Sequence, residues 1–181
     1  LVDLFSLGKA QETVQLSEQL LVSFSNSATL YNIRGAAYGA LKQFPQAVDS
    51  FQRVLEISPN SAEAYSNMGN ALRAQGDFEA ALVKVYKALE IRPDFIDAHY
   101  NLAINYEEIG ELDHALDNYK KVLERDPSHF SAYNNLANIL LQKGNIKAAI
   151  ENYKQALVFK PDFAEAYNNL GNALEDYNDL T

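Results

Sequence analysis

The sequence predicts an all-α protein built as an α-solenoid, in which antiparallel helix pairs repeat every 34 residues. Two observations carry this prediction. Glycines recur at this interval between two apolar-periodic stretches, at Gly76, Gly110 and Gly144. Four of the five prolines also stand 34 residues apart, at Pro59, Pro93, Pro127 and Pro161. A unit of this length cannot bury its own apolar face, so neighbouring units are expected to stack.

The first helix of each repeat is predicted from the spacing of its apolar residues. In the repeat that begins at Ala62, Tyr65, Met68 and Leu72 follow the three-and-four spacing of an amphipathic helix. The eighth position of the repeat is always small, holding Gly35, Gly69, Ala103, Ala137 and Gly171. We expect these small residues to let the second helix of the pair approach closely.

The second helix is predicted over 78–91 in the same repeat. Gly76 precedes it at a site that favours a left-handed residue, and Asp77 is placed to cap it. The proline ends the second helix because it cannot donate to the helical hydrogen bonds. Three residues depart from the pattern: Lys42 replaces the turn glycine, Val85 replaces the usual aromatic residue, and Arg34 stands where an apolar residue is expected.

This pattern resembles the tetratricopeptide repeat (TPR) family. The family's signature positions hold Tyr65, Met68, Gly69, Leu72, Gly76, Phe78, Ala81, Ala88 and Pro93 in one repeat. The resemblance implies a right-handed superhelix whose first helices line a concave face. The repeats are read as 28–61, 62–95, 96–129 and 130–163, after a degenerate helical cap over 1–27 and before the first helix of a partial repeat over 164–181.

Composition argues against several classes of function. A net charge of −9 with scattered Lys and Arg disfavours nucleic acid and anionic membranes as partners. The absence of Cys excludes a disulfide framework and a thiolate metal site. No apolar run is long enough to span a membrane, and no nucleophile or phosphate-loop motif is present. We expect a cytoplasmic protein that is not an enzyme, has no metal site and uses no cofactor.

The titratable residues do not suggest catalysis either. The three histidines, His99, His114 and His129, cannot be placed on one face with carboxylates, so no metal site is expected. Glu107 and Glu108 are adjacent, and we expect both to face solvent with nothing to raise the pKa of either carboxyl group.

Asparagines recur at positions that the resemblance places on the concave face. An asparagine costs a helix about 0.6 kcal/mol relative to alanine, but its amide offers the donors and acceptor that a peptide backbone needs. We predict a peptide-binding groove formed by Asn67, Asn70, Asn101, Asn135, Asn138 and Asn169, with Tyr100, Ile104 and Leu141 as apolar anchors. The alternative is that the asparagines bond between neighbouring repeats and that the apolar residues pad the contacts between first helices.

Two stretches, 62–69 and 93–103, also resemble the superhelical repeats of the O-linked N-acetylglucosamine transferases, where an asparagine ladder grips the substrate backbone. The cations with which other TPR proteins clamp a carboxylate are missing, since the corresponding positions in one register hold Asn32, Asn67 and Asn101. Binding of acidic chaperone tails is therefore not expected.

The favoured function is a scaffold that binds a protein or peptide. One alternative is a structural or self-assembly module that stacks through exposed terminal helices into a homo-oligomer, since the last helix carries an apolar stripe of Leu170, Leu174 and Tyr177. Another is the substrate-recruiting arm of a glycosyltransferase-type protein whose catalytic domain is absent here. The sequence starts without Met and ends within a repeat, which indicates a piece of a larger protein.

Overall fold

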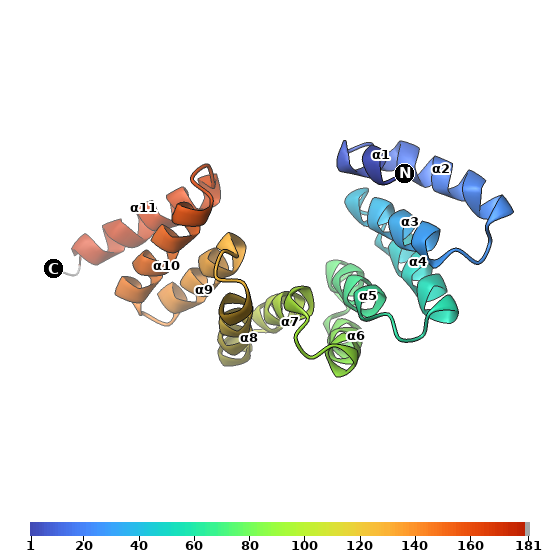
Figure 1. The fold of residues 1–181 in the computed structure, drawn as a ribbon. Coiled ribbons are helices and arrows are strands. Elements are labelled where there is room, and N and C mark those ends of the chain that lie inside the picture. Colours follow the sequence, from blue (N-terminus) through green and yellow to red (C-terminus); the bar gives the residue numbers. More distant parts are fainter. Residues whose placement is uncertain (180–181) are drawn as a thin grey trace. The chain divides into compact units, whose positions relative to one another are not determined.

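Helix pairs follow one another along the computed structural model, which describes residues 1–179 (Figure 1). Within these residues there are eleven helices and no strand. The first helices are α3 (Ala28–Ala40), α5 (Ala62–Ala74), α7 (Ile96–Glu108), α9 (Phe130–Gln142) and α11 (Ala164–Asp179). The second helices are α4 (Phe44–Ile57), α6 (Phe78–Ile91), α8 (Leu112–Arg125) and α10 (Ile146–Phe159), and the cap holds α1 (Val2–Ser6) and α2 (Ala10–Ser23). Because the first helices begin 34 residues apart, the all-α solenoid is confirmed.

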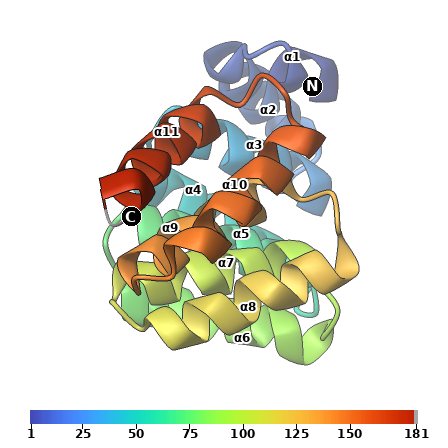
Figure 2. The same ribbon diagram turned by 90° about the vertical axis from the view of Figure 1, so that its left-hand side faces the viewer.

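The chain divides into two compact units, an N-terminal unit over Leu1–Asn101 and a C-terminal unit over Leu102–Thr181. In the N-terminal unit, each helix from α2 to α6 packs against the next one along the chain. In the C-terminal unit, α8 to α11 do the same, and α11 also touches α9 (Figure 2). The division falls within α7.

The turns between paired helices have the conformation that the glycines predict. Gly76, Gly110 and Gly144 have φ angles of 85°, 81° and 78°, in the left-handed region. Lys42 adopts the same conformation with a φ of 57°, although it carries a Cβ. The capping prediction holds for Asp77, which accepts a hydrogen bond from the Ala80 amide at 3.1 Å.

Small residues do bring the two helices of a pair together. A Cβ on Gly69 would lie 2.6 Å from Cγ2 of Val85, and one on Gly35 would lie 2.7 Å from the Phe51 ring. The equivalent residues of the C-terminal unit, Ala103 and Ala137, are fully buried. In the N-terminal unit, a side chain of the second helix therefore occupies the space that a Cβ would take at this position.

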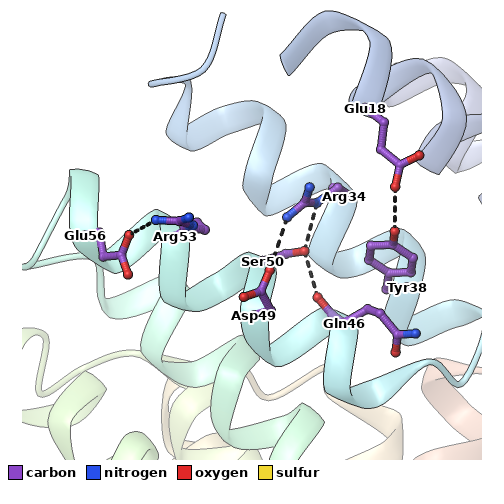
Figure 3. Close-up of polar contacts among 8 residues, drawn as sticks. All are labelled: Glu18, Arg34, Tyr38, Gln46, Asp49, Ser50, Arg53 and Glu56. Carbon is purple, nitrogen blue, oxygen red and sulfur yellow. Dashed lines mark hydrogen bonds and ion pairs between the residues drawn. The ribbon is translucent and has the colours of Figure 1, made fainter. Parts of the chain in front are cut away.

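The unexpected Arg34 lies in a cluster of polar side chains (Figure 3). Its Nε donates to the Ser50 hydroxyl at 3.0 Å, and its guanidinium lies 3.6 Å from the Asp49 carboxylate. The guanidinium carbon also lies 4.9 Å from the centre of the Tyr31 ring, a cation–π distance. Arginine thus replaces an apolar residue without leaving its charge unsatisfied.

Candidate functional site

The N-terminal hollow is a concavity of about 560 Å³ between α3 and α5. Small residues of α3 and α5 form much of its lining, with Phe51 beneath them. Two predicted residues, Asn67 and Asn70, lie in this lining together with Lys42 and Arg73. The hollow therefore combines an apolar floor with amides and two cations.

The C-terminal hollow is a concavity of about 330 Å³ on α7, α9 and α11. It brings together three predicted residues, Ile104, Asn135 and Asn138. The carboxylates of Glu107, Glu108 and Glu165 complete its lining. This concavity is acidic, whereas the N-terminal hollow has cations in its lining.

Two buried tyrosines from the second helices connect to the C-terminal hollow. The Tyr119 hydroxyl donates to Glu107 Oε2 at 2.8 Å and accepts from Asn135 Nδ2 at 3.1 Å. The Tyr153 hydroxyl donates to Asn138 Oδ1 at 2.7 Å. Sequence reasoning missed both tyrosines, although they occupy equivalent positions of two successive repeats.

The expectation for Glu107 was wrong. The side chain is half-buried against Tyr119, and burial raises the pKa of its carboxyl group, aided by the nearby charge of Glu108. The hydrogen bond from Tyr119 opposes this rise in pKa. Burial, with a smaller contribution from Glu165, also raises the pKa of Tyr153 to about 12.

Three of the predicted asparagines bond to the preceding first helix. The Nδ2 groups of Asn67, Asn101 and Asn169 donate to residues 35 positions earlier. The acceptors are Asn32 Oδ1 at 3.4 Å, Ser66 Oγ at 2.9 Å and Asn134 Oδ1 at 3.1 Å. These are bonds between neighbouring repeats, as the second interpretation of the asparagines requires, and peptide binding by these residues stays a prediction.

Asn70 and Asn138 differ from that pattern because only their oxygens are used. Asn70 Oδ1 accepts from Nη2 of Arg73 at 2.9 Å. Asn138 Oδ1 accepts from Tyr153 and, at 3.2 Å, from Nδ2 of Asn169. Within residues 1–179, the Nδ2 group of neither asparagine donates to a protein acceptor. Both lie in the first-helix position that Ile104 occupies in α7.

The remaining predicted residues lie elsewhere. Tyr100 is half-buried in the N-terminal unit, outside both hollows. Leu141 packs against the core cluster of Ala137, Ile150 and Tyr153. On α11, Leu170 and Tyr177 pack against the same cluster, while Leu174 is 38% exposed. Self-assembly through these three residues stays a prediction.

The histidines have structural contacts. His99 is buried with Nε2 at 2.9 Å from the Pro93 carbonyl oxygen, and His129 Nδ1 accepts from the Ala132 amide at the start of α9. His114 stacks on Tyr106 with ring centres 4.9 Å apart. No group of three or more metal-ligating side chains is found in the part of the chain that the structure describes. None of the described helices has the length and apolar character needed to cross a membrane.

Comparison with protein families agrees with the repeat pattern. A family model described as tetratricopeptide repeat matches residues 26–94 and 60–128, and a second with the same description matches 118–151. A third, described as TPR repeat, matches 137–176. No curated protein matches the chain. The resemblance to glycosyltransferase repeats stays a prediction.

Solved structures resemble the fold over most of its length. The TPR protein TTC0263 of Thermus thermophilus is 21% identical, with a TM-score of 0.82 and 96% and 94% of the two chains covered. MamA is 23% identical, with a TM-score of 0.73 over 90% of this chain and 95% of its own. YrrB, described as a TPR protein with an unusual peptide-binding site, is 24% identical, with a TM-score of 0.68 over 91% and 85%. At these identities the likeness shows the fold.

Proposed function

This chain belongs to the tetratricopeptide repeat family, and from that premise we propose that it is a protein-interaction scaffold. It binds an extended peptide segment along the asparagine-bearing faces of its first helices. Repeat scaffolds of this kind are typically non-catalytic, and no reaction is part of the proposal. YrrB is described as having a peptide-binding site, which supports the idea that this fold can present one.

The observation that carries the proposal is an equivalent pair of asparagines in each hollow. Asn67 and Asn70 line the N-terminal hollow, and Asn135 and Asn138 line the C-terminal hollow at the same positions of the repeat. Each unit thus offers a concavity with two side-chain amides on one first helix. Amides suit backbone groups of an extended peptide regardless of its side chains.

Asn70 and Asn138 are the residues best prepared to bind. Their oxygens are held by Arg73 and by Tyr153, so the orientation of each amide is fixed before a ligand arrives. The Nδ2 groups remain available to donate to peptide carbonyl oxygens, at little further cost in side-chain entropy. The other asparagines of the predicted groove support the first helices through their own hydrogen bonds.

The test uses a pool of random decapeptides and the full chain. The double variant Asn70→Ala with Asn138→Asp should lose about tenfold or more in affinity for the pool, because two donors are removed. Asp at 138 keeps an oxygen that can accept from Tyr153, so the fold should be preserved, as checked by circular dichroism. Asn152→Ala is the control, since Asn152 lies on a second helix and donates to the Ala148 carbonyl. Unchanged affinity in the double variant would contradict the proposal.

A second candidate function is self-assembly, and exposed apolar side chains on α11 favour it. Leu174 is 38% exposed and Tyr167 is 54% exposed. Light scattering over a concentration series tests this function directly. A mass that rises with concentration in the native chain but not in Leu174→Ser would support it, and a constant monomer mass would contradict it.

A further inference from the structure

The N-terminal hollow exists because α3 has small side chains where other first helices have larger ones. Ala36, Gly39 and Ala40 all line the hollow. At the position of Gly39, the following first helices carry Arg73, Glu107, Leu141 and Glu175. A Cβ built on Gly39 meets no other atom within 4 Å. The space that a large side chain fills in the other repeats is therefore open in this one.

Aromatic residues surround that space. Phe51 is 4% exposed and lies at the base, while Phe5 of α1 and Phe44 of α4 also belong to the lining. With Ala71 of α5, these residues make most of the interior apolar. Such a site favours a large apolar side chain over a polar one because it removes apolar surface from water.

The charged residues that line the hollow differ in sign from the net charge of the chain. The net charge is −9, yet the charged residues in this lining are Lys42 and Arg73, with no carboxylate among them. Nη2 of Arg73 is held by Asn70 Oδ1 at 2.9 Å, which orients the guanidinium. Neither cation lies at the positions where other members of the family clamp a carboxylate.

Lys42 gives a second, independent indication. It occupies the turn position where Gly8, Gly76, Gly110 and Gly144 stand in the other repeats, and all five residues have left-handed backbone angles. A residue with a Cβ is strained in this conformation. The strain occurs at the repeat whose hollow has room for a ligand side chain, and there it places an ammonium group in the lining.

We propose that the N-terminal hollow is a specificity pocket that seats one large apolar side chain, aromatic or leucine, of the bound peptide segment. Lys42 meets a carboxylate next to that side chain. This inference rests on the proposed function and adds the sequence preference that a row of amides alone would not give. The occupant is a partner peptide in which acidic residues flank a large apolar residue, chosen by complementarity to the Lys42 ammonium group.

The test compares three fluorescein-labelled decapeptides in a glycine–serine background. Their centres are Asp-Phe-Asp, Asp-Ser-Asp and Lys-Phe-Lys, and binding to the full chain is followed by fluorescence anisotropy. The Asp-Phe-Asp peptide should bind about tenfold more tightly than Asp-Ser-Asp, because only the phenylalanine fills the pocket. It should also bind more tightly than Lys-Phe-Lys, by a ratio that decreases as salt is added.

Two variants connect the preference to the pocket. Gly39→Leu fills the open space and should abolish the advantage of phenylalanine over serine, while Gly171→Leu, where an added Cβ also meets no atom within 4 Å, should leave it intact. Lys42→Glu should reduce or reverse the preference for Asp-Phe-Asp over Lys-Phe-Lys. Lys42 is exposed, so this second variant tests the pocket even if Gly39→Leu fails to fold.

Different results would contradict the pocket and the scaffold. Equal binding of Asp-Phe-Asp and Asp-Ser-Asp, or a preference that survives Gly39→Leu, would overturn the pocket and leave the scaffold proposal intact if random decapeptides still bind. Failure of the native chain to bind random decapeptides would overturn the scaffold itself. A concentration-dependent dimer that Gly39→Leu disrupts would overturn the peptide assignment in favour of a second copy of the chain.

Discussion

The N-terminal and C-terminal units fill the same inward position of the second helix in different ways. In the N-terminal unit this position holds Phe51 and Val85, which lie so close to Gly35 and Gly69 that a Cβ would collide with them. In the C-terminal unit it holds Tyr119 and Tyr153, whose hydroxyls bond to Glu107 and Asn138. At this position, apolar contacts in the N-terminal unit are thus replaced by hydroxyl hydrogen bonds in the C-terminal unit.

The two hollows differ accordingly. Cations and an aromatic floor characterise the N-terminal hollow, whereas three carboxylates characterise the C-terminal hollow. Both keep the same pair of asparagines on the first helix. The same pair of asparagines therefore recurs while the side chains around it vary, and under the proposed function this would combine general affinity with local preference.

The largest expected effect comes from the close approach of the helices in the N-terminal unit. Gly69→Ala should destabilise the chain by about 1–3 kcal/mol, because the new Cβ would collide with Val85. A helical glycine elsewhere gains stability from the same change. Urea unfolding followed by circular dichroism measures the shift. In the C-terminal unit, Ala137→Gly should cost about 1 kcal/mol, and a stabilising Gly69→Ala would contradict the close approach.

The hydroxyl network of the C-terminal unit is tested by Tyr153→Phe. Loss of the bond to Asn138 should cost about 1 kcal/mol, because the phenyl ring keeps its packing but the donor is gone. Tyr167→Phe is the control, since Tyr167 is 54% exposed. Equal unfolding midpoints for Tyr153→Phe and the native chain would show that this hydroxyl contributes nothing to the stability of the unit.

The turn position allows a reciprocal exchange between the units. Lys42→Gly should stabilise the chain by up to about 1 kcal/mol, because glycine adopts a positive φ without strain. Gly110→Lys in the C-terminal unit should destabilise it by a similar amount. Thermal unfolding of both variants checks the pair. Shifts of the same sign would exclude backbone strain as the cause.

The smallest expected effect is a pH dependence at Glu107. Since burial raises the folded-state pKa of this carboxyl group, the folded state binds more protons than the unfolded state between the unfolded and folded values. Stability from this group therefore falls as pH rises through that window. At pH 7, the free energy of unfolding of Glu107→Gln should exceed that of the native chain by less than about 1 kcal/mol. The gain should vanish below about pH 4, which urea titrations at several pH values would measure. A gain that is independent of pH would indicate a cause other than ionisation.

Much of the fold could be predicted because one period controls it. The first helices begin at the residues where the repeat pattern starts, and the turn glycines have the backbone angles that their position requires. Even Lys42 follows its position rather than its residue type. In a repeat protein, the residues that start helices and form turns recur often enough to be recognised in a single sequence.

The candidate site was less predictable because it depends on contacts between helices. The periodicity did not show that Tyr119 reaches back to Glu107, which changes the burial and the pKa of that carboxyl group. The same limit applies to the asparagines. Their shared positions were visible, but whether Asn67 donates to Asn32 or to a ligand depends on side-chain geometry. The hollow that Gly39 lines was not predicted, because it arises from a missing side chain. Only Gly39 is small among the residues at this position of the repeats.

The most direct test of peptide binding by the asparagine faces is a nuclear magnetic resonance titration of side-chain amides. The chain is labelled with ¹⁵N and titrated with random decapeptides while the side-chain NH₂ resonances are followed. Shifts are expected for Asn70 and Asn138, whose Nδ2 groups would donate to the peptide, and none for Asn152 on its second helix. Binding that leaves the resonances of Asn70 and Asn138 unmoved would contradict peptide binding by the asparagine faces.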